Sequence, residues 1–247
     1  MTSGASHAEW QWFDLMLGLT SDLLPFVATP NLPISPHSQL SAYGKVPSLI
    51  NGSGHVVGLS QWPTRVTTDA DIAGWSRNMN YGICLNTRRV RAIDVDIDDA
   101  AYSARVLHAI LAWNPDIVWP VRTRPNSAKH ALLFELEGSF SKQRLTTPHG
   151  IIEFLANGQQ ILIAGPHSSG ARYRWAHSDA LGSECLPRHI PVLTEEEWGD
   201  LRDTLEMIFG SEAWSAGRVG KARDRESVSS VESDPVAVYL KANGWAV

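Results

Sequence analysis

The stretch RAIDVDIDD at residues 91–99 decides the fold of this 247-residue chain. Apolar and acidic residues alternate in it, which is the pattern of a β-strand with one buried face and one polar face. The apolar residues are therefore expected in the core, and Asp94 and Asp96 are expected on the opposite face. Their carboxylates would stand about 7 Å apart, from a rise of about 3.3 Å per residue.

Two carboxylates at this spacing predict a site for a divalent cation, which binds oxygen ligands at roughly 2.0–2.6 Å. The alternative is a strand that ends in solvent, with its acids at the start of the next helix. We favour that alternative for Asp98 and Asp99, and the metal site for the two earlier acids. A calcium-binding loop is excluded, because its glycine position holds Asp99 and its bidentate glutamate position holds Arg105.

The sequence around this strand predicts further strands with one helix between them. Strands are expected at 81–85, 116–124, 130–136, 150–155 and 160–165, and a helix at 99–113. The strand–helix–strand order predicts an α/β layer, and the close spacing of the later strands predicts antiparallel pairing. We therefore expect an α+β sheet with helices on one side. The turn at 156–158 predicts a hairpin between the last two strands.

The remaining segments are expected to be helices, a long loop and a linker. Helices are predicted at 8–24, from a Thr68 cap to residue 75, at 194–210, and at 234–247. Residues 25–63 are rich in Pro, Ser and Gly and predict a loop. Residues 218–233 are charged and serine-rich, which is the composition of a linker.

The composition excludes several protein classes. Two cysteines are too few for a disulfide scaffold or a cysteine-based zinc site. We see no signal peptide and no apolar stretch of membrane-spanning length, so we expect a cytoplasmic protein that is not in a membrane. The net charge is −5, yet residues 88–174 hold 11 Lys and Arg against 8 Asp and Glu. The region of the candidate metal acids is thus the basic one, as suits a polyanionic substrate.

Two further stretches carry candidate ligands. The loop before the 130–136 strand offers cations and a hydroxyl that can grip phosphate oxygens. Its candidate residues are Arg122, Arg124, Ser127, Lys129 and the strand-initial His130.

The stretch 150–175 adds a third acid and more bases. Glu153 lies inside an apolar strand, where a lone acid requires a metal or a cation. His167, Arg172 and Arg174 follow in a polar turn and could hold a nucleotide, although decoration of an edge strand is the alternative.

These motifs, taken in order, resemble those of a known family. NYGICLNT at 80–87, AIDVDI at 92–97, AKHALLF at 128–134 and IEFLANGQQILIAGPHSSGARYRW at 152–175 occur in succession. They resemble the primase–polymerase domain at the N-terminus of phage and plasmid replication proteins, within the archaeo-eukaryotic primase superfamily. The resemblance covers about residues 45–175 and includes Lys45 in an upstream K-x-P element.

The resemblance implies an RRM-like catalytic sheet with an accessory N-terminal α/β portion. It implies template-directed nucleotidyl transfer, in which Asp94, Asp96 and Glu153 hold two Mg²⁺ or Mn²⁺ ions and His130 contacts the nucleotide phosphates. Ser127 would substitute for a hydroxyl that the family usually has two residues before this histidine. The other residues expected at the nucleotide or template are Lys45, Arg122, Arg124, Lys129, His167, Arg172 and Arg174.

The implied partners are a single-stranded DNA template, a primer, and dNTPs or NTPs. The expected organisation is a primase–polymerase catalytic domain at 1–210, a linker at 211–233 and the start of a C-terminal helical element at 234–247, which would join a helicase domain or partner. Two alternatives stay open: a metal-dependent nuclease or phosphotransferase, and a non-catalytic, DNA-binding replication-initiator module.

Overall fold

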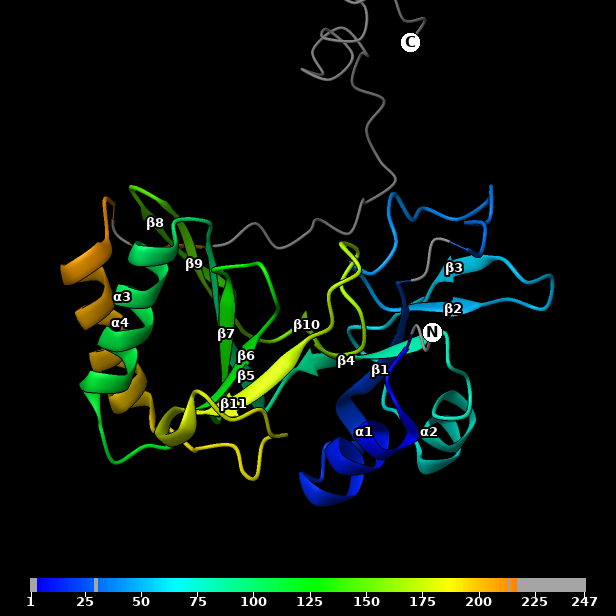
Figure 1. The fold of residues 1–247 in the computed structure, drawn as a ribbon, viewed down its shortest axis with the longest axis horizontal. Coiled ribbons are helices and arrows are strands. Elements are labelled where there is room, and N and C mark those ends of the chain that lie inside the picture. The colour runs from blue at the N-terminus through cyan, green and yellow to red at the C-terminus, as the bar shows by residue number, and fades with distance from the viewer. Residues whose placement is uncertain (1–3, 29–30, 213, 217–247) are drawn as a thin grey trace, which may run out of the picture. The chain divides into compact units, whose positions relative to one another are not determined.

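The computed structural model describes residues 4–28, 31–212 and 214–216 (Figure 1). The largest sheet has seven strands. Their spatial order is β11 (Arg174–His177), β6 (Pro120–Thr123), β7 (His130–Glu135), β5 (Val90–Ile97), β9 (Gly150–Leu155), β8 (Gln143–Thr147) and β12 (Ser215–Ala216). A second sheet has the order β1 (Leu23–Val27), β4 (Tyr81–Thr87) and β10 (Gln159–Ala164), and a small third sheet pairs β2 (Ser48–Ile50) with β3 (Val56–Gly58).

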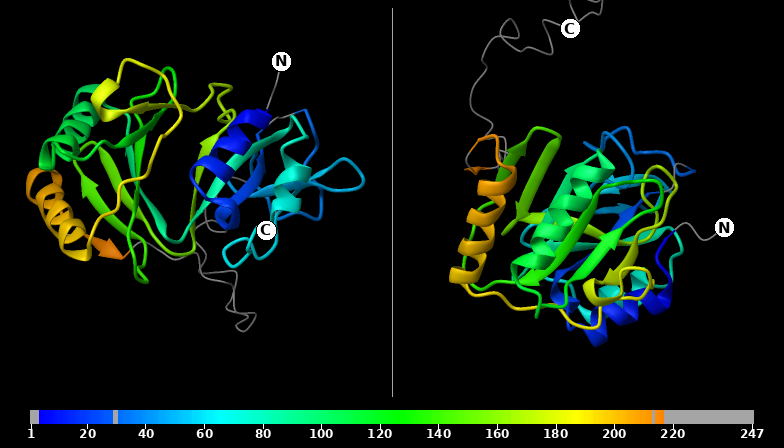
Figure 2. Two further views of the ribbon diagram at one scale, coloured as in Figure 1. Left: turned by 90° about the horizontal axis from the view of Figure 1, so that it is seen from below. Right: turned by 60° about the vertical axis from the view of Figure 1, so that its left-hand side comes forward.

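Helices cover one face of the seven-stranded sheet. They are α3 (Ala100–Trp113) and α4 (Glu195–Phe209), which lie beside each other on that face (Figures 1 and 2). Apolar residues of both helices pack with the odd-numbered residues of β5, among them Ile93 and Val95, in one buried cluster. The prediction of a mixed α+β fold is confirmed, and the RRM-like arrangement stays a prediction.

The opposite face of the large sheet is covered in part by the three-stranded sheet and the N-terminal elements. Ala92 on β5 and Ala131 on β7 are buried with Ile83 on β4 and Ile163 on β10. The elements of this portion include α1 (His7–Gln11), a π-helical turn (Trp12–Met16), a 3₁₀ turn (Thr20–Asp22) and α2 (Asp69–Trp75). A short 3₁₀ turn (Ser178–Ala180) follows β11.

Two side chains of the large sheet donate hydrogen bonds to the backbone of β10. The β10–β4 register shifts between Leu162 and Ala164, so Ile163 is the extra residue of a bulge. The Trp175 indole donates to the Ile163 carbonyl at 2.8 Å. The Arg122 guanidinium donates to the Leu162 carbonyl. The bulge thus provides acceptors that join the two sheets.

Several sequence-based expectations about helices are confirmed. Asp99 is the N-cap of α3, and its carboxylate accepts from the Tyr102 amide at 2.8 Å. Thr68 and Thr194 each begin a helix with a capping box, and Gly210 is the C-cap of α4. The acids and hydroxyls at these positions satisfy amides that have no partner within the helix.

Other expectations are wrong. The predicted helix at 8–24 ends after Met16, because the chain turns at Gly18 with φ +63° and then enters β1 to pair with β4. The predicted loop at 25–63 contains the end of β1 and both strands of the small sheet. The predicted hairpin across 156–158 does not form, since β9 pairs with β5 and β8 whereas β10 pairs with β4.

The predicted linker and C-terminal helix, at 218–233 and 234–247, lie outside the described residues. The predicted boundaries of the catalytic domain and linker stay predictions. In the described part of the chain, no helix combines the length and the apolar character needed to cross a membrane.

Candidate active site

An acidic row runs along the face of β5 that the helices do not cover. Along this face Ala92 is buried, whereas the Asp94 side chain is 30% exposed and the Asp96 side chain is 52% exposed. Glu153 of β9 is the register partner of Asp94. Directly paired residues of antiparallel strands project to the same face, with Cβ atoms about 4.5–5.5 Å apart. The backbone therefore brings the three predicted acids to one face.

Each of these three acids has a basic partner. The Arg122 guanidinium lies 3.3 Å from Asp94, the Lys129 ammonium 2.7 Å from Asp96, and the Lys142 ammonium 2.7 Å from Glu153. Lys129 also contacts the exposed Asp98 at 3.2 Å. The acidic row is thus balanced by neighbouring cations.

The surroundings of Asp94 disfavour the charged form of its carboxyl. Burial raises the pKa of its carboxyl above the usual value, and the Arg122 charge opposes that rise. The charges of Glu153 and Asp96 raise the pKa further, while Lys142 lowers it. A bound cation would relieve the desolvation and the repulsion together.

The donor set fits a hard divalent cation in chemical type. Carboxylate oxygens are the preferred ligands of Mg²⁺, and the three acids share a face. Their oxygens are nevertheless turned toward the three bases. Among the residues that the structure describes, no group of three His, Cys, Asp or Glu side chains is arranged to hold a metal ion. The structure therefore supplies the ligands on one face, but not in a closed coordination shell.

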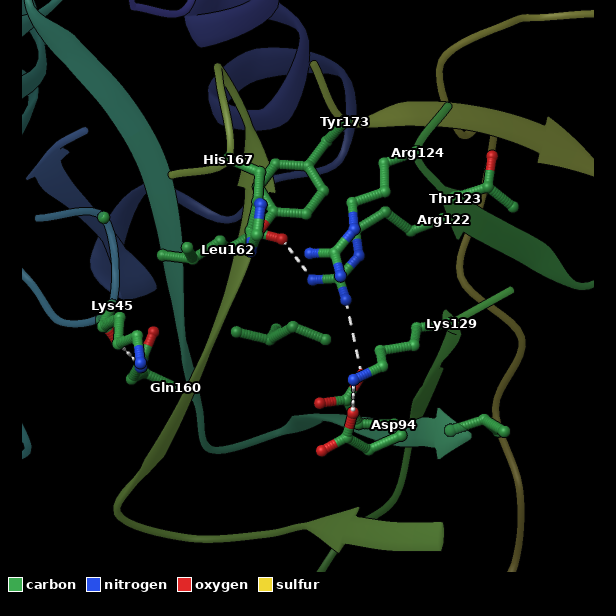
Figure 3. Close-up of a pocket in the computed structure, with 14 residues that line it drawn as sticks. Lys45, Asp94, Arg122, Thr123, Arg124, Lys129, Gln160, Leu162, His167 and Tyr173 are labelled. Atoms are coloured by element: carbon green, nitrogen blue, oxygen red, sulfur yellow. Dashed lines mark hydrogen bonds and ion pairs between the residues drawn. The ribbon is translucent and has the colours of Figure 1, made fainter. Parts of the chain in front are cut away.

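A cavity of about 430 Å³ opens over the acidic row. One wall comes from β5, β6 and the loop that follows β6, and the other from β10 and the segment around Gly44 (Figure 3). Its charged and polar lining residues are Lys45, Asp94, Asp96, Arg122, Thr123, Arg124, Lys129, Gln160, His167 and Tyr173. The acids occupy one end of the cavity, and most of the bases lie around the rest of it (Figure 3).

The basic part of the cavity perturbs His167. Burial lowers the pKa of its imidazole, and the charges of Arg124, Arg122, Lys129 and Lys45 lower it further. Its Nδ1 lies 2.9 Å from the Ser169 hydroxyl. Four cations thus act on one point of the cavity, which makes it a ready site for a polyanion.

Gln160 fixes the position of Lys45. The Gln160 side-chain amide donates to the Lys45 carbonyl at 2.7 Å, and its oxygen lies 2.8 Å from the buried Cys84 sulfur. Gly44 beside it adopts φ +61°, and its amide donates to the Val27 carbonyl at 2.8 Å. The segment that carries Lys45 is therefore attached to the three-stranded sheet on both sides of the residue.

The comparison with known families agrees with this geometry. Residues 7–192 match the family described as bifunctional DNA primase/polymerase, N-terminal, or Prim-Pol. The chain belongs to the Prim-Pol family. The match includes the acidic row and the whole of the cavity lining. No curated protein matched the chain.

Membership of the Prim-Pol family carries general implications. It implies nucleotidyltransferase activity in replication, with DNA and nucleotides as substrates. Prim-Pol enzymes are also generally metal-dependent. The acidic end and the basic remainder of the cavity are the two kinds of surface that such a reaction needs.

His130 does not join the other Prim-Pol candidates in the cavity. It is the register partner of Val95, so its side chain projects to the helix-covered face, opposite to Asp94. Its Nδ1 lies 3.1 Å from the Ser103 hydroxyl of α3, and that hydroxyl donates to the Ala128 carbonyl at 2.6 Å. Burial lowers the pKa of His130 to about 4. The expectation that His130 contacts phosphates is therefore not supported by its position.

The remaining predicted residues divide between two surfaces, except for Ser127, which lines neither. Lys45, Arg124 and His167 line the cavity. Ser127 does not line it, and its hydroxyl accepts from the Lys129 amide at 3.3 Å. Arg172 and Arg174 line a neighbouring groove instead. The nucleotide and template candidates thus divide between two adjacent surfaces.

The sequence reasoning missed three residues of the site. Lys142, the partner of Glu153, precedes β8, a strand that was not predicted. Gln160 and Tyr173 lie within the GQQ and RYRW stretches, in which the sequence pattern points only to the basic residues as ligands. The Arg122 guanidinium lies 4.7 Å from the centre of the Tyr173 ring, a cation–π contact. The signal in the sequence that could have identified Gln160 and Tyr173 is their position beside the predicted ligands.

Proposed function

We propose that this chain is a template-directed DNA primase–polymerase that uses two divalent ions. In this proposal Asp94, Asp96 and Glu153 hold the ions, which are Mg²⁺ or Mn²⁺. The observation that carries the proposal is one cavity lined at one end by Asp94 and Asp96 and elsewhere by five basic side chains. Glu153 lies outside the cavity lining but on the same face of the sheet, as the register partner of Asp94. A nucleoside triphosphate needs both surfaces, one at the reacting α-phosphate and one along the phosphate chain.

The bases of the cavity would bind and orient the triphosphate. Arg124 and Lys45 approach from opposite walls, and Lys129 lies between the acids and the open space (Figure 3). Held by donors from several directions, the phosphates would be aligned for attack by the primer 3′-hydroxyl. Gln160 would contribute by keeping the Lys45 segment in place.

The acids would exchange their partners when ions bind. Bound ions supply neutralisation of charge at the α-phosphate and a lowered pKa of the primer hydroxyl. The Asp96–Lys129 pair is partly exposed, with side chains 52% and 30% exposed, so its separation has a modest energetic cost. Lys129, released from Asp96, would then be free to contact phosphate. Lys142 would give up Glu153 in the same way.

The biological setting is part of the proposal and rests on the resemblance of the sequence motifs. The protein would act in the cytoplasm as part of a phage, prophage or plasmid replication protein. A helicase domain or partner would follow the catalytic domain. Preference for dNTPs or NTPs is read out by the experiment below.

The test is extension of primed and unprimed DNA templates with dNTPs or NTPs, in Mg²⁺ or Mn²⁺. We expect metal-dependent synthesis by the wild type, and a fall to background for Asp94→Asn, which removes one ligand charge without changing size. Loss of a residue that only supports a metal ligand typically costs about 10–100-fold in activity, so loss of a ligand's charge should cost at least as much. Asp203→Asn, an exposed acid of α4 that pairs with Arg202, is the matched control and should retain full activity.

Each other result has a definite meaning. Full synthesis by Asp94→Asn, with circular dichroism showing a folded protein, would overturn the assignment of the metal acids. Hydrolysis of DNA without synthesis would favour the nuclease alternative. DNA binding without any metal-dependent turnover would favour the replication-initiator module.

A further inference from the structure

A second concave surface lies directly beside the nucleotide cavity. It is a groove of about 740 Å³, called here the side groove, and its lining includes Asn126, Ser169, Arg174 and Cys185. Tyr173 lines both the side groove and the nucleotide cavity. The two surfaces therefore adjoin at this residue.

We propose that the side groove binds the single-stranded template. This inference rests on the proposed polymerase function and adds the location of the template to it. A template base must pair with the nucleotide in the cavity, so the template strand must run past the cavity wall. The side groove meets that requirement because the two surfaces share Tyr173.

The chemistry of the side groove matches a single nucleic-acid strand. Arg174 and the exposed Asn126 and Ser169 provide hydrogen-bond donors for phosphate oxygens and base edges. Tyr173 provides the accessible aromatic surface in the same lining, whereas Trp175 is buried beneath it in the core. Basic groups beside an aromatic ring are a usual construction of sites for single strands.

The positive charge of Arg174 in the side groove is paired with an acid that a phosphate could replace. Arg174 forms an ion pair with Glu184, and their side chains are 48% and 61% exposed. An ion pair this exposed is weak, so Arg174 can exchange Glu184 for a phosphate. Arg172 differs, because it donates to the Gly4 carbonyl at 2.7 Å and to Glu9 and so fixes the N-terminal segment. Arg174 is therefore the residue to test.

The two cysteines give a direct probe of the side groove in the unmodified protein. Cys185 lines the groove and is partly exposed, whereas Cys84 is fully buried. Alkylation with a maleimide should therefore modify Cys185 selectively. A single-stranded oligodeoxynucleotide at ten times its Kd should slow that reaction about tenfold. A dNTP alone should leave the rate unchanged, because Cys185 does not line the nucleotide cavity.

A charge-reversal variant provides the second measurement. Arg174→Glu should weaken binding of a fluorescent oligonucleotide about tenfold, and should reduce the slope of log Kd against log salt by about 0.7. Its affinity for dNTP, measured without DNA, should equal that of the wild type. Arg202→Glu changes a half-buried α4 residue paired with Asp203, makes the same charge change outside the groove, and should bind oligonucleotide normally.

The results that would overturn the proposal are distinct from a failure of the polymerase assignment. Unchanged alkylation of Cys185 by saturating oligonucleotide would exclude the side groove as the template site, even if synthesis is observed. Equal weakening by the Arg174 and Arg202 variants would show that only overall charge matters. Protection of Cys185 by dNTP alone would make the groove part of the nucleotide site. Protection by oligonucleotide without synthesis would leave the groove intact and refute the catalytic proposal alone.

Discussion

Acidification should destabilise this protein through His130, which the structure buries as a neutral imidazole. Nδ1 lies 3.1 Å from the Ser103 hydroxyl and 3.3 Å from the Ala128 carbonyl. Because that hydroxyl donates to the same carbonyl, Nδ1 is inferred to carry the proton of the neutral ring. Nε2 is buried and has no hydrogen-bond partner. Protonation would therefore place a charge and an unpaired N–H in a closed site. Desolvation is the main cause of the lowered pKa, and the charge of Arg122 acts in the same direction.

The size of the effect follows from the pKa values of the two states. The His130 pKa is about 4 in the folded protein against an ordinary 6.5. The unfolded chain takes up the proton first as the pH falls, so this contribution to stability is complete above pH 6.5 and is lost toward pH 4. The loss amounts to about 3 kcal/mol, at about 1.4 kcal/mol for each tenfold change in affinity for the proton.

The assay is urea unfolding of the wild type and His130→Asn at a series of pH values from 7.5 to about 4. The asparagine keeps a donor near the Ser103 hydroxyl but does not titrate, so the variant should lose about 3 kcal/mol less stability across this range. Burial also lowers the pKa of His167 and His177, and both contributions remain in the variant and cancel in the comparison. His108→Asn removes an exposed imidazole of α3 and serves as the control.

Parallel pH profiles for the wild type and His130→Asn would refute this reasoning. They would mean that His130 is not held neutral against α3. The helix-covered position would then be wrong, and the contact with nucleotide phosphates implied by the sequence motif would regain support.

Two further predictions concern the acidic row and the cavity wall. Lys142→Gln should lower the free energy of unfolding by about 1–3 kcal/mol in EDTA, because Glu153 loses its partner; added Mn²⁺ should raise Tm more than in the wild type, and an equal or smaller rise would count against a metal at Glu153. Gln160→Met should raise the nucleotide KM about fivefold with kcat little changed, the effect of one lost hydrogen bond to the Lys45 segment. Gln11→Met, an exposed control, should not change either value, and a fall in kcat alone would contradict the positioning role of Gln160.

Local patterns in the sequence predicted what local physics determines. The alternation in residues 91–99 places Asp94 and Asp96 on one face because side chains of a strand alternate strictly. Asp99 and Thr194 begin helices because a side-chain oxygen satisfies a free amide within three residues. These interactions join residues that are close in sequence and can therefore be predicted from the sequence alone.

The predictions that were wrong depend on which distant segments pair with one another. The turn at 156–158 has the composition of a hairpin turn, yet β10 pairs with β4. In that pairing Ile161 and Ile163 join the buried cluster on the face of the large sheet opposite to the helices. The facing of His130 depends on its register with Val95, which no local pattern specifies. The pairing of Glu153 with Lys142 likewise required a strand that the sequence did not reveal. The acids of the site could be predicted, but not the bases that balance them.

The bulge in β10 gives the nucleotide cavity a mechanical property. Its two walls belong to different sheets, and the Arg122 and Trp175 side chains attach one wall to consecutive carbonyls of the other. A change in the angle between the sheets would alter the width of the opening. Loosening the Trp175 attachment should therefore change how tightly a nucleotide is held while the carboxylates keep their partners, because Trp175 lies outside the cavity lining, whereas Arg122 both lines the cavity and pairs with Asp94.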